Sequence, residues 1–394
     1  GGQWIGAGHT RLRKLAGNAG VSIRPQFDTG GKLLHLQRSL KRYSGAIPNV
    51  SPVSLIELEL ALRKLKKLAA RIDVNAPWAS QSASRWDAQT LETWARRRLR
   101  TRAAREIFDI AVRAVLTSEP SAVSFLYFLF YCESNNGFDA LTKATGGAQA
   151  EVVVGGMPQL AQYLADGLSA PVQLNEPVTE IRQNDSKVEV ITALGTYTAE
   201  RVVVAVAPAI LDRIEFSPKL PVQRQRLAAQ MPMGSVIKCV IAYERPFWRD
   251  AGLSGEAVSH SLPFNTVFDA SWSAEQGGGL VGFFDGQSAL DYADASEQER
   301  RQAVIDSLVY YFGEVARNPR NYVDYNWLQD PWARGCYVGV MPPGVMTTLG
   351  PALRSPAGRV HWAGTETATQ WCGYIEGALQ SGERVAAELR AVLA

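Results

Sequence analysis

A cysteine and a tyrosine stand side by side in RGCYVGVMPPG (334–344), between two glycines and ahead of a Pro-Pro pair. A thiol reacts as a nucleophile once it is deprotonated, and flanking glycines allow the backbone to approach a ligand closely. The other cysteines, Cys132, Cys239 and Cys372, form no CxxC or CxxH spacing, so neither a zinc site nor a disulfide framework is predicted. Cys336 is either an ordinary buried cysteine or an attachment point.

Lys238 lies inside SVIKCVIAYE, an apolar stretch with the composition of a strand. A lysine in such a strand is costly to bury unless it has a partner or a task, so the pattern favours a functional role over an edge-strand surface position. A third group of chemical interest is WAGTETATQWCGYIEGALQSGERVAAEL (362–389), in which a strand ends at Gly364, Glu366 follows, and a helix starts near Gly373. The start of that helix can face an anionic or electron-rich ligand.

Common catalytic motifs are missing from the chain. It has no GxSxG, HExxH or GxxxxGK[ST] pattern, and its four histidines are isolated, so hydrolase, zinc-peptidase and P-loop activities and a metal site are not predicted. GGGLVG (277–282) matches GxGxxG, but it precedes a strand and opens no helix. A phosphate loop requires a strand, a glycine turn and then a helix, so we interpret this match as accidental.

The elements that must position these residues are those of an ordinary globular chain. Its 394 residues are 46% hydrophobic and carry a net charge of +3, which predicts no nucleic-acid partner. Residues 54–70 and 90–114 repeat apolar positions at three and four and are expected to be helices with basic polar faces. The six arginines between Arg96 and Arg105 indicate either a solvated helix face or a nucleic-acid or membrane surface, and the near-neutral charge favours the first.

The apolar run AVSFLYFLFY (122–131) is shorter than the roughly 20 residues that span a bilayer, so it is expected to be a core helix. From Glu151 the chain alternates strands and helices, with EVVVGG, PVTEIRQNDSKVEVIT and ERVVVAVAP as strands and MPQLAQYLADGL as a helix. These hydrophobic runs predict an α/β fold with α+β elements, in which the sheet is covered on both faces. The unpaired cysteines favour a cytoplasmic setting.

Four segments together resemble the flavin-containing monoamine oxidases. They are GGQWIG at the start, MPMGSVIKC with PFWR, RGCYVGVMPPG, and AGTETATQWCGYIEGA, in the order of that family and across nearly the whole chain. The resemblance implies a glutathione-reductase-like FAD-binding domain interleaved with a substrate domain of mixed sheet and helices. The expected boundaries are residues 1–23, 155–227 and 330–394 for the FAD-binding domain, and residues 24–154 and 228–329 for the substrate domain.

The resemblance also implies roles for single residues. Cys336 corresponds to the cysteine that forms a thioether with the flavin in monoamine oxidases, although some relatives bind FAD without a covalent bond, so both states stay open. Lys238 corresponds to a lysine that reaches toward flavin N5 through a water molecule. Tyr337 and Tyr374 correspond to the two tyrosines that flank the substrate amine, and two ring faces attract and orient an amine.

Further residues are expected around the cofactor and the substrate. The FAD-binding set implied by the resemblance comprises Gly1, Gly2, Trp4, Val178, Gly364, Thr365, Glu366, Gly373 and Ile375. The substrate cavity is expected to be lined by Val115, Leu141, Gln149, Thr266, Val281 and Phe283. This largely apolar lining suits an aryl or alkyl amine and lowers the pKa of the amine.

One part of the family pattern is not in this sequence: the GxGxxG unit of about 30 residues that holds the FAD diphosphate should precede GGQW. Either that unit is a separate part or the chain is a truncated product that binds FAD poorly. We expect a soluble protein without a membrane anchor that oxidises a primary amine with dioxygen and forms hydrogen peroxide. Alternatives are a polyamine oxidase with acidic residues such as Glu133, Asp139 or Asp269, an L-amino-acid oxidase with a cavity arginine, or a flavin-free binding protein. A homodimer is also an open alternative.

Overall fold

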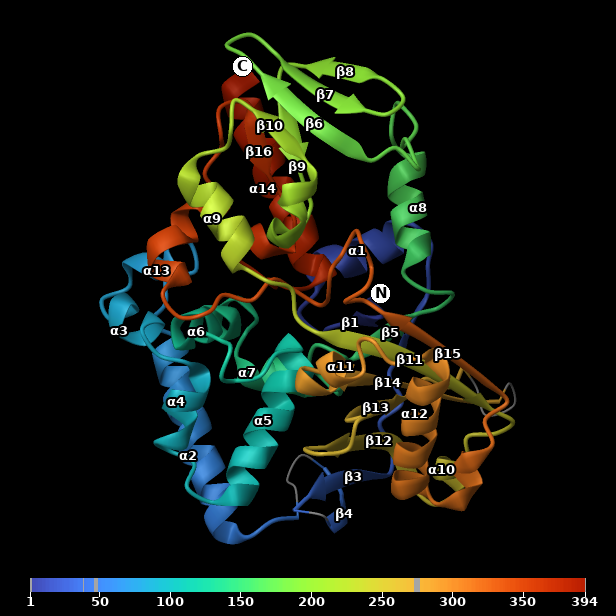
Figure 1. Ribbon diagram of the computed structural model, residues 1–394. Helices are drawn as coiled ribbons and strands as arrows, with labels where there is room; N and C mark the ends of the chain where they lie inside the picture. The colour runs from blue at the N-terminus through green and yellow to red at the C-terminus, as the bar shows by residue number, and fades with distance from the viewer. Residues whose placement is uncertain (1, 38, 46–48, 273–276, 394) are drawn as a thin grey trace.

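The computed structural model describes residues 2–37, 39–45, 49–272 and 277–393. In this part of the chain, helices pack on and beside four sheets (Figure 1). The largest sheet lies in the lower half of the view in Figure 1, and the smaller sheets with the long C-terminal helix lie above it.

The large sheet has seven strands in the order β15-β11-β14-β13-β12-β3-β4. Its strands are β3 (Gly31–Leu36), β4 (Ser39–Tyr43), β11 (Val236–Tyr243), β12 (Leu253–Ser259), β13 (Thr266–Asp269), β14 (Gly278–Asp285) and β15 (Asn321–Asn326). All neighbours are antiparallel except β12 and β3. One face packs on α12 (Glu297–Phe312), which begins at a capping box formed by Ser296 and Glu299. The other face is left to line the site described below.

Three smaller sheets complete the strand content of the described residues. β1 (Trp4–Ile5), β5 (Glu151–Val153) and β2 (Ile23–Pro25) form one; β10 (Glu215–Ser217), β6 (Val178–Gln183), β7 (Val188–Thr192) and β8 (Thr196–Ala199) form the second; β9 (Val202–Val204) and β16 (Val360–Trp362) pair in parallel. Beside them run α1 (Thr10–Asn18), α8 (Pro158–Asp166), α9 (Val222–Gln230) and α14 (Ile375–Leu393). The strands and helices expected from residue 151 onward are thus present, and the division into two domains stays a prediction.

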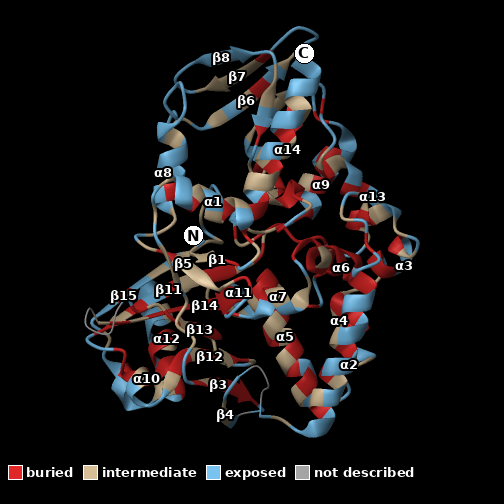
Figure 2. Cartoon of the chain, turned by 180° about the vertical axis from the view of Figure 1, so that it is seen from behind, coloured by how far each residue is buried: buried red, intermediate tan, exposed pale blue. Residues whose placement is uncertain are grey.

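A helical layer lies to the side of the large sheet. It contains α2 (Pro52–Ala69), α3 (Ala83–Asp87), α4 (Leu91–Arg96), α5 (Arg102–Leu116), α6 (Phe125–Ser134) and α7 (Phe138–Thr142). The run predicted to be a core helix is α6, which Figure 2 shows as buried along its length. No helix among the described residues is long and apolar enough to cross a membrane. Shorter helices α10 (Phe247–Asp250), α11 (Gln287–Asp291) and α13 (Val345–Leu349) join these elements.

The single helix expected over residues 90–114 is wrong, because the chain leaves the helix between α4 and α5. The Glu57 carboxylate, on α2, accepts hydrogen bonds from the backbone N–H groups of Arg100 and Thr101 at 3.1 and 2.8 Å. This contact from another helix satisfies the free N–H groups at the start of α5. The buried Leu99 anchors the connection in the core.

A second difference concerns the apolar strand at residues 202–204, which was expected to be covered on both faces. Val204 is buried, but Val203 remains 36% exposed, because β9 is paired only with β16 and no described element packs over that side chain. The GGGLVG match belongs to β14, an antiparallel strand, so its interpretation as an accidental match is confirmed.

Candidate active site

A cavity of about 1320 Å³ lies between the large sheet, the helical layer and the start of α14. Its volume exceeds the roughly 300–1,000 Å³ of most small-molecule pockets, so it has room for more than one small ligand or for a large cofactor. Most of the residues predicted from the sequence line it: Gly2, Trp4, Val115, Leu141, Gln149, Lys238, Thr266, Phe283, Cys336, Tyr337, Gly364, Thr365, Glu366, Gly373, Tyr374 and Ile375.

Two predicted residues do not line the cavity, and a third lies outside the described residues. Val281 is buried in a cluster with Val236 and Phe283, two residues that do line the cavity. Val178 begins β6 in the small upper sheet and packs in a separate core, so its contact with the adenine of FAD stays a prediction. Gly1 lies outside the described residues.

The loop that carries Cys336 and Tyr337 is held against the segment just before β11. The N–H of Cys336 donates to the carbonyl of Gly234 at 2.9 Å, and the N–H of Gly234 donates to the carbonyl of Val338 at 3.1 Å. A Cβ on Gly335 would lie 2.3 Å from the Gly234 carbonyl oxygen, and its φ is +140°, so only glycine fits there. MPMGS and RGCYV, far apart in the sequence, therefore act as one structural unit.

The Cys336 thiol is largely buried at the cavity wall. Burial raises its pKa to about 11, and the nearby Lys238 ammonium opposes part of this rise. The thiol is therefore the resting form near neutral pH. The Thr117 hydroxyl donates to the carbonyl of Cys336 and anchors the residue from the end of α5.

Lys238 projects from β11 into the cavity. Its ammonium donates to the side-chain oxygen of Gln3 at 2.6 Å and lies 5.9 Å from the centre of the Phe283 ring. Burial lowers its pKa to about 8, so the amine titrates within the working range of most enzymes. The sequence analysis missed Gln3, although it stands inside the quoted GGQWIG segment between two predicted residues.

Tyr337 and Tyr374 come to the cavity from different elements. Tyr337 packs edge-on against Phe283 with ring centres 6.0 Å apart, and Tyr374 packs edge-on against Trp371 and His9 at 5.4 and 5.3 Å. Burial raises the pKa of both phenols, so both stay protonated at ordinary pH. Edge-on contacts fix the planes of the two rings.

The turn between β16 and α14 brings backbone close to the cavity. The Thr365 hydroxyl accepts from the N–H of Gly373 at 2.7 Å and donates to the carbonyl of Tyr374 at 2.9 Å. Gly364 and Gly373 have φ of +101° and +89°, and a Cβ on Gly373 would lie 2.5 Å from the Tyr131 hydroxyl. Gly373 therefore leaves room for the Tyr131 side chain, and the turn places backbone at the cavity wall next to the start of α14, where an electron-rich ring system would fit.

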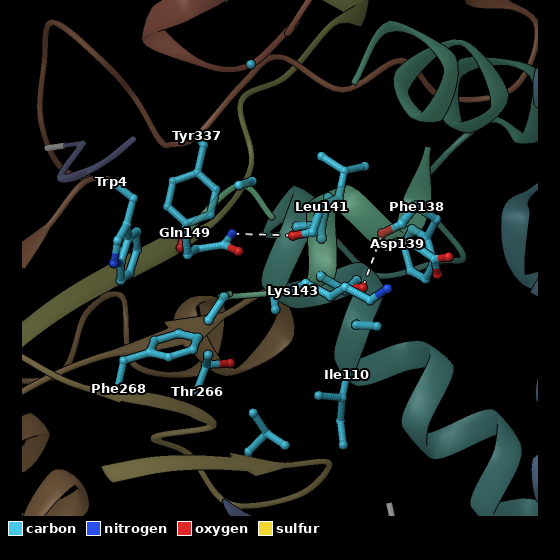
Figure 3. Close-up of a pocket in the computed structure, with 18 of the residues that line it drawn as sticks. Trp4, Ile110, Phe138, Asp139, Leu141, Lys143, Gln149, Thr266, Phe268 and Tyr337 are labelled. Carbon is cyan, nitrogen blue, oxygen red and sulfur yellow. Dashed lines mark hydrogen bonds between the residues drawn. The ribbon is translucent and has the colours of Figure 1, made fainter. Parts of the chain in front are cut away.

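The two ends of the cavity carry different side chains. Figure 3 shows Tyr337, Gln149 and Trp4 grouped at one end and Asp139 and Lys143 at the other. The Gln149 amide donates to the Leu141 carbonyl at 3.3 Å (Figure 3), which orients its oxygen. The lining is thus largely apolar, with aromatic rings at one end and the charged Asp139 and Lys143 at the other.

Charged residues at the mouth of the cavity are largely paired with one another. Lys32 bridges Asp28 at 2.8 Å and Glu256 at 2.7 Å. Of the acidic residues considered for a polyamine oxidase, Asp139 lines the cavity, whereas Glu133 and Asp269 do not. Asp269 instead binds the guanidinium of Arg249 and the indole N–H of Trp248, so it serves the core.

One more acidic residue near the site escaped the sequence analysis. Asp285 ends β14 and is fully buried, and neither carboxylate oxygen makes a well-formed hydrogen bond with the described residues, the Thr266 hydroxyl being the polar group beside it. In FFDG an aspartate before glycine has the composition of an exposed turn, which is why the sequence carried no signal for its burial.

Comparisons with known proteins agree with this geometry. Residues 1–390 match the family described as flavin containing amine oxidoreductase. The chain is 37% identical over 393 residues to a probable flavin-containing monoamine oxidase A of Dictyostelium discoideum, covering 99% of this chain and 86% of that protein. The chain belongs to the flavin-containing amine oxidoreductases. It is therefore an enzyme that uses FAD, as the sequence predicted.

Solved structures show the same fold. Cyclohexylamine oxidase from Brevibacterium oxydans matches with a TM-score of 0.94 at 32% identity, covering all of this chain and 87% of that one. A putrescine oxidase bound to putrescine matches with a TM-score of 0.95 at 28% identity, covering 99% of this chain and 88% of that one. The expected mixed helix and sheet fold of an FAD-dependent amine oxidase is thus confirmed.

Proposed function

We propose that this enzyme oxidises a primary aryl or alkyl amine to the imine, which hydrolyses to the aldehyde. The observation that carries the proposal is the convergence of Tyr337, Tyr374 and Lys238 on one cavity whose lining is largely apolar. An apolar wall binds a hydrocarbon side chain, and two aromatic rings position the amine nitrogen.

The residues of this chain have distinct tasks in that reaction. Tyr337 and Tyr374 hold the amine between their rings, and their edge-on neighbours keep both planes fixed. The wall formed by Val115, Leu141 and Phe283 disfavours a charged guest, so it lowers the pKa of the bound amine and favours the neutral form. Lys238, held by Gln3, presents a polar N–H group at the cofactor side.

The cofactor side is built by glycine-rich backbone. Gly2, Gly364, Thr365, Glu366 and Gly373 would hold the ring system and the chain attached to it, next to the start of α14. Bound FAD supplies the two-electron acceptor for the amine's α-hydrogen and is reoxidised by dioxygen, which yields hydrogen peroxide.

The thiol of Cys336 is proposed as the attachment point of the flavin. It lies at the cavity wall in a loop that approaches closely because Gly335 carries no side chain. Acid precipitation of the wild-type protein should leave yellow colour in the pellet, and Cys336→Ala should release the flavin into the supernatant. Flavin that stays in the Cys336→Ala pellet would contradict the thioether, and flavin released from the wild type would show non-covalent binding.

The reaction itself is tested by mixing the FAD-loaded protein with amines without oxygen. Benzylamine or a simple alkylamine should bleach the flavin absorbance, and admission of air should restore it with one peroxide formed per amine consumed. Putrescine and L-amino acids serve as comparison substrates. The only arginine that lines the cavity in the described residues, Arg63, is paired with Glu59, so amino acids should react poorly. Failure of every amine to bleach the flavin would overturn the proposal.

A further inference from the structure

Asp285 is the least satisfied polar side chain near the site. Its backbone is anchored, since its N–H donates to the side-chain oxygen of Asn265 at 3.2 Å and its carbonyl accepts from the Asn265 amide at 3.2 Å. Its carboxylate, by contrast, is fully buried and neither oxygen makes a well-formed hydrogen bond with the described residues, although the Thr266 hydroxyl lies near enough to lower its pKa. A buried carboxylate without a partner costs stability, and such groups concentrate where function requires them.

The strand register places Asp285 on the face of β14 that borders the cavity, although Asp285 itself does not line it. Alternate residues of a strand share a face, so Asp285 points to the same side of β14 as Phe283. Phe283 pairs with Thr266 on β13 and packs against Tyr337, and all three line the cavity. Burial is the main reason that the pKa of the Tyr337 phenol is raised. The negative charge of Asp285 is the next largest cause.

Several charged and titratable groups surround Asp285. Arg113 on α5 and Glu119, which follows it, lie on the far side; they are 3.9 Å apart, and Arg113 also donates to the carbonyl of His260. A Cβ on Gly286 would lie 2.7 Å from Glu119 and 3.3 Å from the Arg113 side chain, which shows how closely both cover the end of β14. The positive charge of Arg113 is thus shared with a second carboxylate, and Lys238 on β11 is already bound to Gln3.

Burial raises the pKa of Asp285 to about 7, opposed in part by the Thr266 hydroxyl and by Arg113, while Glu119 adds to the rise. The carboxyl therefore changes its charge at neutral pH, where a simple alkylamine, like the lysine side chain, is still an ammonium ion. An apolar cavity tolerates an ammonium poorly unless a negative charge accompanies it.

We propose that Asp285 balances the charge of the incoming amine, so that the ammonium ion enters with its proton and that proton stays inside the site. The N–H bond of the ammonium breaks and an O–H bond forms on the carboxylate, with the Thr266 hydroxyl between them, which leaves a neutral amine and a neutral carboxyl group. No other reactant is needed. Asp285 acts through Thr266 and is a positioning residue for the proton. This inference rests on the proposed amine oxidase function.

The test counts protons when an amine that cannot react binds to the FAD-loaded enzyme. Cumylamine has no α-hydrogen, and titration calorimetry in two buffers of different ionisation heat gives the number of protons released per amine bound. At pH 8 the wild type should release close to none, because the amine's proton moves to Asp285. Asp285→Asn should release about one, because only neutral amine then fits the site.

A second readout is the pH dependence of binding. Affinity for cumylamine should be nearly flat between pH 7 and 9 in the wild type, whereas in Asp285→Asn it should fall about tenfold for each unit below the amine's pKa. Lys238 also titrates near pH 8, but it is common to both proteins, so their difference isolates Asp285.

The matched control is Asp291→Asn, which removes one negative charge from an exposed position on α11 and should behave as the wild type. Asp285→Ser repeats the test if the asparagine variant does not retain flavin. Equal proton counts and equal pH slopes in the wild type and the Asp285 variants, with flavin bleaching intact, would overturn this inference alone. If no amine binds to the enzyme, both this inference and the proposed function would be overturned.

Discussion

The two walls of the cavity treat buried polar groups in opposite ways. On the cofactor wall each has a partner within the chain: Lys238 binds Gln3, the N–H of Gly339 donates to Glu366 at 3.2 Å, and Thr365 bridges Gly373 and Tyr374. Beside the amine wall, the carboxylate of Asp285 makes no well-formed hydrogen bond with the described residues and has only the Thr266 hydroxyl near it. Satisfied groups hold a geometry in place, whereas an unsatisfied group is free to respond to a ligand.

The largest effect predicted from this comparison is on how the free energy of unfolding depends on pH. The pKa of Asp285 is about 7 in the fold and 3.8 in an unfolded chain, so the folded protein binds more protons between these values and loses stability as pH rises from about 4 to 7. The free energy of unfolding should fall by about 4 kcal/mol over this range, because each pKa unit corresponds to 1.36 kcal/mol. Asp285→Asn should remove this slope, which urea unfolding at pH 5 and pH 8 can measure. An unchanged slope, with Asp291→Asn as the control, would mean that the carboxyl is not strained by burial.

A substitution of Lys238 tests the cofactor wall of the cavity. Lys238→Met keeps the length of the side chain but removes its charge and its bond to Gln3. We expect the rate of anaerobic flavin reduction to fall on the order of a hundredfold, because the polar contact at the cofactor side is lost. Lys66→Met, on the exposed face of α2, should leave the rate unchanged. A loss that appears in substrate affinity alone would place Lys238 on the amine side.

Substitution of Tyr374 should reduce activity less than substitution of Lys238. Tyr374→Leu removes one aromatic wall, and we expect about a tenfold loss in kcat/KM for benzylamine, since a cation or amine over a ring gains up to about 2 kcal/mol. Tyr374→Phe keeps the ring and should retain most of the activity. If the phenylalanine variant lost as much as the leucine variant, the hydroxyl group would carry the role.

Substitution of Gln3 should change the rate of flavin reduction least. Gln3→Leu removes the acceptor that stabilises the Lys238 ammonium at 2.6 Å, so the pKa of Lys238 should move further below about 8. In the pH profile of the flavin reduction rate, the limb that follows the titration of Lys238 should move toward lower pH by a fraction of a unit. The rate of flavin reduction should change by a few-fold. A profile that does not move would mean that Gln3 contributes packing only.

Local patterns predicted helices such as α2 and α6, because their burial follows from their own sequence. The break between α4 and α5 was missed because a carboxylate on another helix, Glu57, creates it. Val203 was expected to be buried for its composition, but whether a valine is covered depends on which element packs over it.

The sequence by itself determined which residues carry the chemistry: Cys336 beside Tyr337, Lys238 within an apolar strand, and the glycine turn before Tyr374 were recognisable from residue types and order. Only the tertiary structure decided their electrostatics. The pairing of Lys238 with Gln3 and the burial of Asp285 under Arg113 and Glu119 join residues more than 150 positions apart. The physical reason is that a pKa depends on solvent exclusion and neighbouring charge, and the fold alone brings both together.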